Sequence, residues 1–233
     1  MKQLLSTIYC DFLIQLRNGF YTATFFVLFL VALGLSRLPE VDWGWLLPLA
    51  ILIYMNMTAY YFIAAQVLLE KDEGVSVIRA VMPFSPLHYL CSKIITLSFL
   101  AVIESVVLAI VLYGINFNWF PFISSILLAS AFYALIGFIS VTSYNSLEEY
   151  LLPSVLYGAL ASLSLITGLA QFESPLLFLH PIQAVLVILQ SAFAPIDSGL
   201  LAYGVLYSII SLIALCYICI RLYQGMVIRD MEG

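Results

Sequence analysis

Long apolar runs alternate with short polar stretches along the whole chain, and this pattern predicts membrane-spanning helices. A transmembrane helix needs about 20 predominantly apolar residues. Backbone groups in lipid must pair within their own segment, which favours helices, whereas a barrel strand would alternate apolar and polar residues. We therefore predict an all-α integral membrane protein with a single domain over residues 1–233. Six transmembrane helices are expected at roughly 20–36, 46–69, 87–113, 120–142, 150–170 and 199–221.

Two further segments carry patterns of their own. Residues 1–19 repeat apolar residues at helical spacing with Asp11, Gln15 and Arg17 between them, which is typical of an interfacial helix in the headgroup region. The apolar run that follows lacks a small-residue cleavage site, so we interpret it as a retained span. Residues 171–198 are interrupted by prolines, and their apolar part is too short to cross a bilayer. We expect an outer re-entrant helical hairpin there.

The composition excludes a water-soluble domain and sets the expected orientation. Only 9% of the residues are charged and 64% are hydrophobic, whereas soluble domains carry about 25% charged residues. If the N-terminus is cytoplasmic, only Arg37 of the eight Lys and Arg residues falls on the outer side. Because basic residues favour the cytoplasmic side, we expect a multi-pass protein of the cell (cytoplasmic) membrane, surrounded by the lipid bilayer, with both termini in the cytoplasm.

The segment between the second and third apolar runs is the most highly charged part of the chain. Four consecutive charges are followed by an amphipathic stretch of about two helical turns, and Ser85-Pro86 then resembles a cap and first position of a new helix. This pattern indicates a short cytoplasmic surface helix, whose apolar face contacts either lipid or a soluble partner. The charged and amphipathic positions are Glu70, Lys71, Asp72, Glu73, Val75, Ile78, Arg79, Val81 and Met82.

A few polar residues interrupt the apolar runs. Asn56, Tyr60 and Gln66 lie in the second run and Glu104 lies in the middle of the third. Buried amides often join helices to one another, and ionisable groups at bilayer depth often mark a transport path. Both interpretations stay open for these four positions. Glu148 and Glu149 follow Ser146 at capping-box spacing, so they either stabilise a helix start or contact a partner.

No motif for chemistry on nucleotides, peptides or esters is present. The chain lacks GxxxxGK[ST], HExxH and GxSxG, and it has two histidines in all. We therefore expect no catalytic residue, no metal site, no cofactor bound by this chain and no nucleic-acid partner.

Taken in order, three stretches resemble the ABC-2 type permease family, and within it the small drug- or fluoroquinolone-export permeases. LLEKDEGVSVIRAVMPFSPLHYLCSK (68–93) is similar to that family's coupling segment, which we place at 70–86. LHPIQAVLVILQSAF (179–193) is similar to its outer re-entrant segment, and RNGFY (17–21) is similar to the start of its first span.

The resemblance implies a transmembrane permease subunit that exports a hydrophobic or amphipathic small molecule by alternating access. A separate ABC ATPase subunit would bind ATP and Mg and receive the coupling helix, with Glu148 and Glu149 as a second contact. A second permease copy or a sister permease would complete a dimer, with the substrate path at the seam.

Two alternatives remain at this point. One is a proton-coupled secondary transporter that uses Glu104, although the inverted repeats typical of such proteins are not visible. The other, which we consider weaker, is an intramembrane enzyme built around Glu148 and Glu149.

Overall fold

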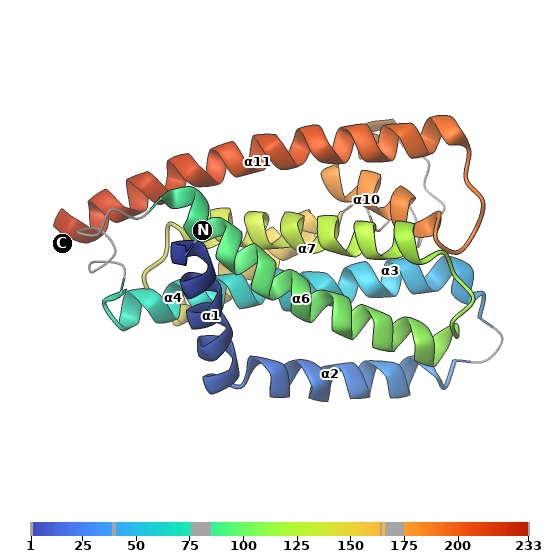
Figure 1. The fold of residues 1–233 in the computed structure, drawn as a ribbon, viewed down its shortest axis with the longest axis horizontal. Coiled ribbons are helices and arrows are strands. Elements are labelled where there is room, and N and C mark those ends of the chain that lie inside the picture. Colours follow the sequence, from blue (N-terminus) through green and yellow to red (C-terminus); the bar gives the residue numbers. More distant parts are fainter. Residues whose placement is uncertain (1, 39–40, 76–84, 164, 166–174, 233) are drawn as a thin grey trace.

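The computed structural model describes residues 2–38, 41–75, 85–163, 165 and 175–232, and its regular elements over these residues are all helices (Figure 1). The elements are α1 (Lys2–Arg17), α2 (Phe20–Leu35), α3 (Trp43–Met55), η1 (Asn56–Tyr60), α4 (Tyr61–Asp72), α6 (Pro86–Leu112), α7 (Trp119–Val141), α8 (Leu147–Ala161), η2 (Pro175–Leu179), α10 (Pro181–Gln190) and α11 (Ser198–Glu232).

Four helical stretches in the described residues are long and apolar enough to cross a membrane. They are Trp43–Asp72, Pro86–Leu112, Trp119–Val141 and Ser198–Met226, and α1 with α2 adds a fifth if that bent pair is counted as one span. Four of the expected spans therefore have counterparts of sufficient length. The expected span at 150–170 is described only in part, as α8, because residues 164 and 166–170 lie outside the described residues. Six spans remain a prediction.

The chain bends sharply between α1 and α2, as the Asn18-Gly19 sequence predicts. The two helices meet at an angle of 60°, and Gly19 adopts a left-handed conformation with φ 73°, which costs glycine little. Figure 1 shows α1 lying across the bundle, against α6, while α2 runs along it. The placement of α1 at a membrane surface stays a prediction.

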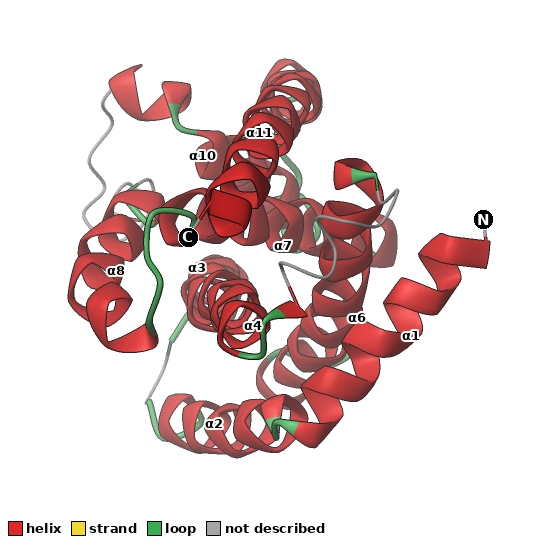
Figure 2. Ribbon diagram, turned by 90° about the vertical axis from the view of Figure 1, so that its left-hand side faces the viewer, coloured by secondary structure: helices red, strands yellow, loops and turns green. Residues whose placement is uncertain are grey.

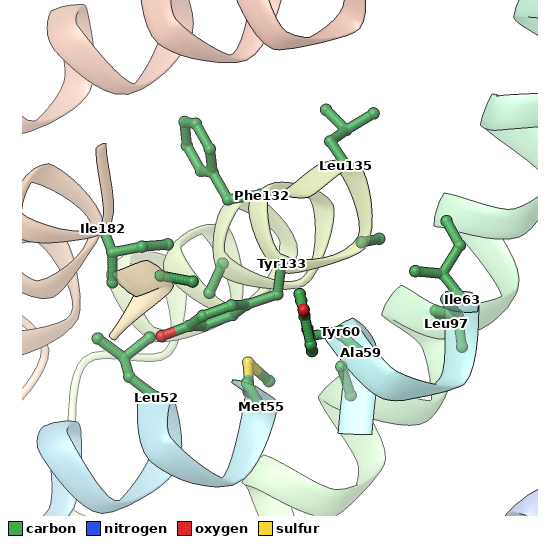
Figure 3. Close-up of a cluster of buried hydrophobic side chains, with 14 of the residues drawn as sticks. Leu52, Met55, Ala59, Tyr60, Ile63, Leu97, Phe132, Tyr133, Leu135 and Ile182 are labelled. Carbon is green, nitrogen blue, oxygen red and sulfur yellow. The ribbon is translucent and has the colours of Figure 1, made fainter. Parts of the chain in front are cut away.

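The centre of the bundle is formed by α3–η1–α4 and α7. Figure 2 shows α3 and α4 end-on, surrounded by α2, α6, α7 and α8. Their most apolar stretches are 61% and 67% buried, against 17% for α11. Gly137 on α7 permits a close approach, because a Cβ there would lie 2.5 Å from the backbone oxygen of Tyr60. The large side chains of this core, including Tyr60 and Tyr133, fill the space between the helices (Figure 3).

The segment expected to form a re-entrant hairpin contains two short helices, η2 and α10, and each begins at a proline. His180 caps the start of α10, and its Nδ1 accepts a hydrogen bond from the Ile182 N–H at 3.3 Å. Residues 182–189 of α10 are all buried, and α10 packs against α11, α7 and α3. The apolar run that is too short to span thus packs against protein over most of its length. Re-entry from the outer leaflet stays a prediction.

Candidate functional site

One buried cluster joins three helices at the end of the bundle where α4 ends and α6 begins, which we name the link end. Lys93 of α6 is 0% exposed, and its Nζ lies 2.7 Å from Glu70 Oε1 of α4 and 3.3 Å from Asp11 Oδ1 of α1. A third acceptor, Gln66 Oε1, lies at 3.4 Å. An ammonium group has three donors, so each donor of Lys93 has an acceptor.

Hydroxyl groups complete the cluster. The Tyr89 hydroxyl donates to Glu70 Oε2 at 2.8 Å, and Ser92 Oγ donates to Asp11 Oδ2 at 2.6 Å. Every carboxylate oxygen of the two acids therefore accepts a hydrogen bond, which suits two ionised carboxylates around one ammonium. We refer to Asp11, Gln66, Glu70, Tyr89, Ser92 and Lys93 as the Lys93 cluster.

The other charged residues at the link end make contacts nearer the protein surface. Lys71 Nζ donates to the backbone oxygen of Tyr144 in the α7–α8 loop at 2.6 Å. Glu73 pairs with Arg17 at the end of α1 at 3.0 Å, and both side chains are largely exposed. Of the four consecutive charged residues 70–73, Asp72 is the one without a contact of this kind in the described part of the chain. Its side chain is exposed.

The other residues expected to contact an ATPase are placed as follows. Val75 is half-buried just beyond the end of α4. Ile78, Arg79, Val81 and Met82 lie outside the described residues. Glu148 and Glu149 are exposed at the start of α8, where Ser146 Oγ accepts a hydrogen bond from the Glu149 N–H at 3.3 Å. The cap expected from the sequence is present, and a partner contact stays a prediction.

The four candidate substrate-path residues all hold helices together. Gln66 belongs to the Lys93 cluster, and Asn56 Nδ2 donates to Gly158 O at 3.0 Å and to Ser162 Oγ at 2.6 Å. The Tyr60 hydroxyl donates to Ser154 O on α8 at 3.2 Å. These contacts support the role as links between helices that the sequence left open.

Glu104 forms a second polar site, deep in the bundle. It is 0% exposed, and Thr58 Oγ1 donates to its Oε1 at 2.7 Å, while Oε2 has no hydrogen-bond partner in the described structure. Thr58 lies in the π-helical turn Asn56–Tyr60, and such turns are frequent at functional sites. The arrangement leaves one carboxyl oxygen available for a proton or a ligand.

On the part of the surface that the structure describes, two grooves are lined by other residues. A groove of about 510 Å³ lies between α2 and α6 and is mainly apolar, with Phe25, Phe29 and Val107 in its walls and Arg37 at one end. Another, of about 370 Å³, is lined by Ser140, Tyr157 and His180 among others. Asn56, Tyr60, Gln66 and Glu104 line neither groove, so their place in a substrate path stays a prediction.

Sequence reasoning missed the partners of Glu70. Lys93, which the sequence suggested as one of the basic residues on the cytoplasmic side, is fully buried. Asp11 and Gln15 appeared as polar positions on an interfacial helix, yet both are buried, and Gln15 Nε2 donates to Thr96 Oγ1 at 2.9 Å. The sequence did contain a signal for this contact between α1 and α6. Asp11 and Gln15 are one helical turn apart, and so are their partners Ser92 and Thr96.

Helices able to cross a membrane, joined by buried polar contacts, define a multi-pass helical membrane protein. The chain belongs to the fluoroquinolones export permease protein family, whose model matches residues 2–231. It is 23% identical over 240 residues to fluoroquinolones export permease protein Rv2687c of Mycobacterium tuberculosis (strain ATCC 25618 / H37Rv) and to protein MT2761 of strain CDC 1551 / Oshkosh, covering 98% of this chain and 98% of each relative. No solved structure matches it. Family membership indicates a transporter rather than a catalytic enzyme.

Proposed function

We propose that this chain is the transmembrane subunit of an exporter for a hydrophobic or amphipathic small molecule, and that a separate ABC ATPase subunit drives it by alternating access. The observation that carries the proposal is the family match over nearly the whole chain. The names of the relatives point to export of drug-like compounds. The resemblance of residues 68–93 to the ABC-2 coupling segment is our reason for proposing an ATPase partner. ATP and Mg would be held by that partner.

The link end is where we place the ATPase contact. The Lys71–Tyr144 hydrogen bond brings the end of α4 beside the α7–α8 loop, so the two contact regions expected from the sequence are neighbours. Asp72, Glu148 and Glu149 are exposed there. Glu70 is buried, so we assign the contact to these exposed acids and to the link, residues 73–85 between α4 and α6, rather than to Glu70. A second permease copy or a sister permease would complete the transporter.

The test is reconstitution of the chain with a candidate ATPase subunit in lipid vesicles. The wild-type chain should bind the ATPase, stimulate ATP hydrolysis and support ATP-dependent movement of a fluorescent quinolone. The combined reversals Asp72→Lys, Glu148→Lys and Glu149→Lys should abolish the stimulation, because acidic groups at the contact become basic. Arg37→Glu is the control, since it reverses an exposed charge expected on the opposite side. Stimulation that persists in the triple reversal would contradict the proposed contact.

A second candidate function is proton-coupled transport through Glu104. It is favoured by the buried carboxyl group with one oxygen unpartnered in the described structure. In that case an imposed proton gradient without ATP would drive uptake into vesicles, and Glu104→Gln would abolish it because the amide cannot carry the proton. Transport that requires ATP and survives Glu104→Gln would exclude this candidate.

A further inference from the structure

Most of the four consecutive charged residues, 70–73, bind other parts of the same chain. Glu70 binds Lys93 and Tyr89, Lys71 binds the Tyr144 carbonyl, and Glu73 pairs with Arg17. The end of α4 is therefore attached to α6, to the α7–α8 loop and to the end of α1. The charges that resemble a docking surface in the sequence form an internal connection in the structure.

The buried part of this connection resists separation. Moving α1 away from α6 would leave Asp11, which is 1% exposed, without its charged partner, whereas Lys93 would keep only Glu70 of α4. Removing one member of a buried ion pair is strongly unfavourable, because the remaining charge is left uncompensated in an apolar environment. By comparison, the exposed Arg17–Glu73 pair contributes little. The Lys93 cluster is thus the strong polar contact between α1 and the beginning and end of the link.

A covalent path continues from this cluster to the rest of the bundle. α1 ends at Arg17, and only Asn18 and Gly19 separate it from α2. α2 forms one wall of the 510 Å³ groove, opposite α6. A displacement of the link end that α1 follows would therefore move the start of α2, and the groove would change shape.

We infer that the Lys93 cluster is a positioning device that makes α1 follow the ends of the link, so that a push by the ATPase reaches α2. The inference rests on the proposed function and names Asp11, Glu70 and Lys93 as its positioning residues. Their role is to keep α1, α4 and α6 in register with one another.

The experiment compares transport per ATP hydrolysed in the reconstituted complex. The variant Asp11→Asn/Glu70→Gln/Lys93→Met removes all three charges together and leaves no uncompensated charge, so it should fold with the melting temperature of the wild type within a few degrees. We expect it to bind the ATPase and to hydrolyse ATP, but to lose about fivefold or more in transport per ATP. The single variant Lys93→Arg, which keeps the positive charge and both carboxylates, should retain most of the wild-type ratio of transport to ATP hydrolysis.

The matched control is Ser98→Ala/Ser130→Ala, which removes a buried hydrogen bond of 2.6 Å between α6 and α7. It should leave the transport-to-hydrolysis ratio unchanged. An unchanged ratio in the charge-free variant would overturn the inference and leave the proposed function standing. If the wild-type chain fails to stimulate the ATPase at all, the proposed function fails and the inference fails with it. A charge-free variant that does not fold would also overturn the inference, since the charges would then be needed for folding itself.

Discussion

Helix α6 carries a buried lysine and a buried glutamate, and their surroundings differ. Lys93, near the start of the helix, meets two carboxylates and an amide oxygen. Glu104, about three turns further along, receives one hydrogen bond from Thr58. The first group is held in a satisfied ionic network, and the second is largely alone in an apolar core. The difference shows that burial alone does not indicate a functional role for an ionisable side chain. Its partners determine whether its charge is held in place or whether it can gain or lose a proton.

The two regions also differ in what surrounds them. The Lys93 cluster lies where separate helices and loops meet, so its contacts can determine how these segments move together. Glu104 faces the π-helical turn in the interior of a long helix, where the backbone departs from regular hydrogen bonding. We therefore expect a single substitution that leaves a charge unpaired at the first site to affect folding strongly, and a substitution at the second site to affect folding little.

The largest effect is expected for Lys93→Met. It leaves Asp11 and Glu70 buried without a counter-charge, so the folded state should lose about 3–5 kcal/mol. Thermal unfolding in detergent, followed by fluorescence size-exclusion chromatography, measures the loss. Lys93→Arg is the control and should keep most of the stability. A melting temperature unchanged by Lys93→Met would contradict an ionised cluster.

Gly137→Ala tests the packing beside the π-helical turn. A Cβ at this position would lie 2.5 Å from Tyr60 O and 2.7 Å from Ile63 Cγ2, so α7 must shift and the protein should lose about 1–3 kcal/mol. Gly225→Ala is the matched control, because nothing lies within 4 Å of a Cβ built there. The same unfolding assay applies, and equal melting temperatures for the two variants would refute the close approach.

Glu104→Gln should change stability by less than about 1 kcal/mol, because the amide oxygen can still accept the Thr58 hydrogen bond. The result sharpens the contrast with Lys93, since both changes remove one buried ionisable group from the same helix. Thr58→Val is the informative companion, as it removes the only donor recorded for Glu104 in the described structure. If Glu104→Gln proved as damaging as Lys93→Met, Glu104 would have to be an ionised and paired group.

The smallest effect is expected for Arg17→Gln. This residue belongs to the link end, but its pair with Glu73 is exposed, so the loss should be less than about 0.5 kcal/mol. Salt screens exposed pairs, and the difference from wild type should therefore shrink further between low and high ionic strength in the unfolding assay. A loss that resists salt would place Arg17 within the buried network.

Local chemistry made much of the helical framework predictable. The apolar runs around 46–69, 87–113, 120–142 and 199–221 were long enough to specify helices, and Ser85-Pro86 and Ser146 marked helix starts that the structure confirms. Each of these signals depends on residues close together in the sequence.

The candidate site depended on contacts that local patterns do not contain. Asp11 and Lys93 are 82 positions apart, and their pairing requires α1 to cross α6 at one particular height. Local sequence also does not determine the surroundings of Glu70, because a carboxylate at this position could equally have faced solvent or a partner protein. The amphipathic helix expected at 75–82 falls mostly outside the described residues, so it remains a prediction.

The bend at Gly19 has a mechanical consequence. Asp11 lies about 12 Å along α1 from that bend, so a rotation of α1 by about 5° would move Asp11 by about 1 Å. The Asp11–Lys93 contact is already 3.3 Å, and hydrogen bonds weaken rapidly beyond about 3.5 Å. A change of a few degrees in the angle between α1 and α2 would therefore break the contact with Lys93 unless α6 moved with α1.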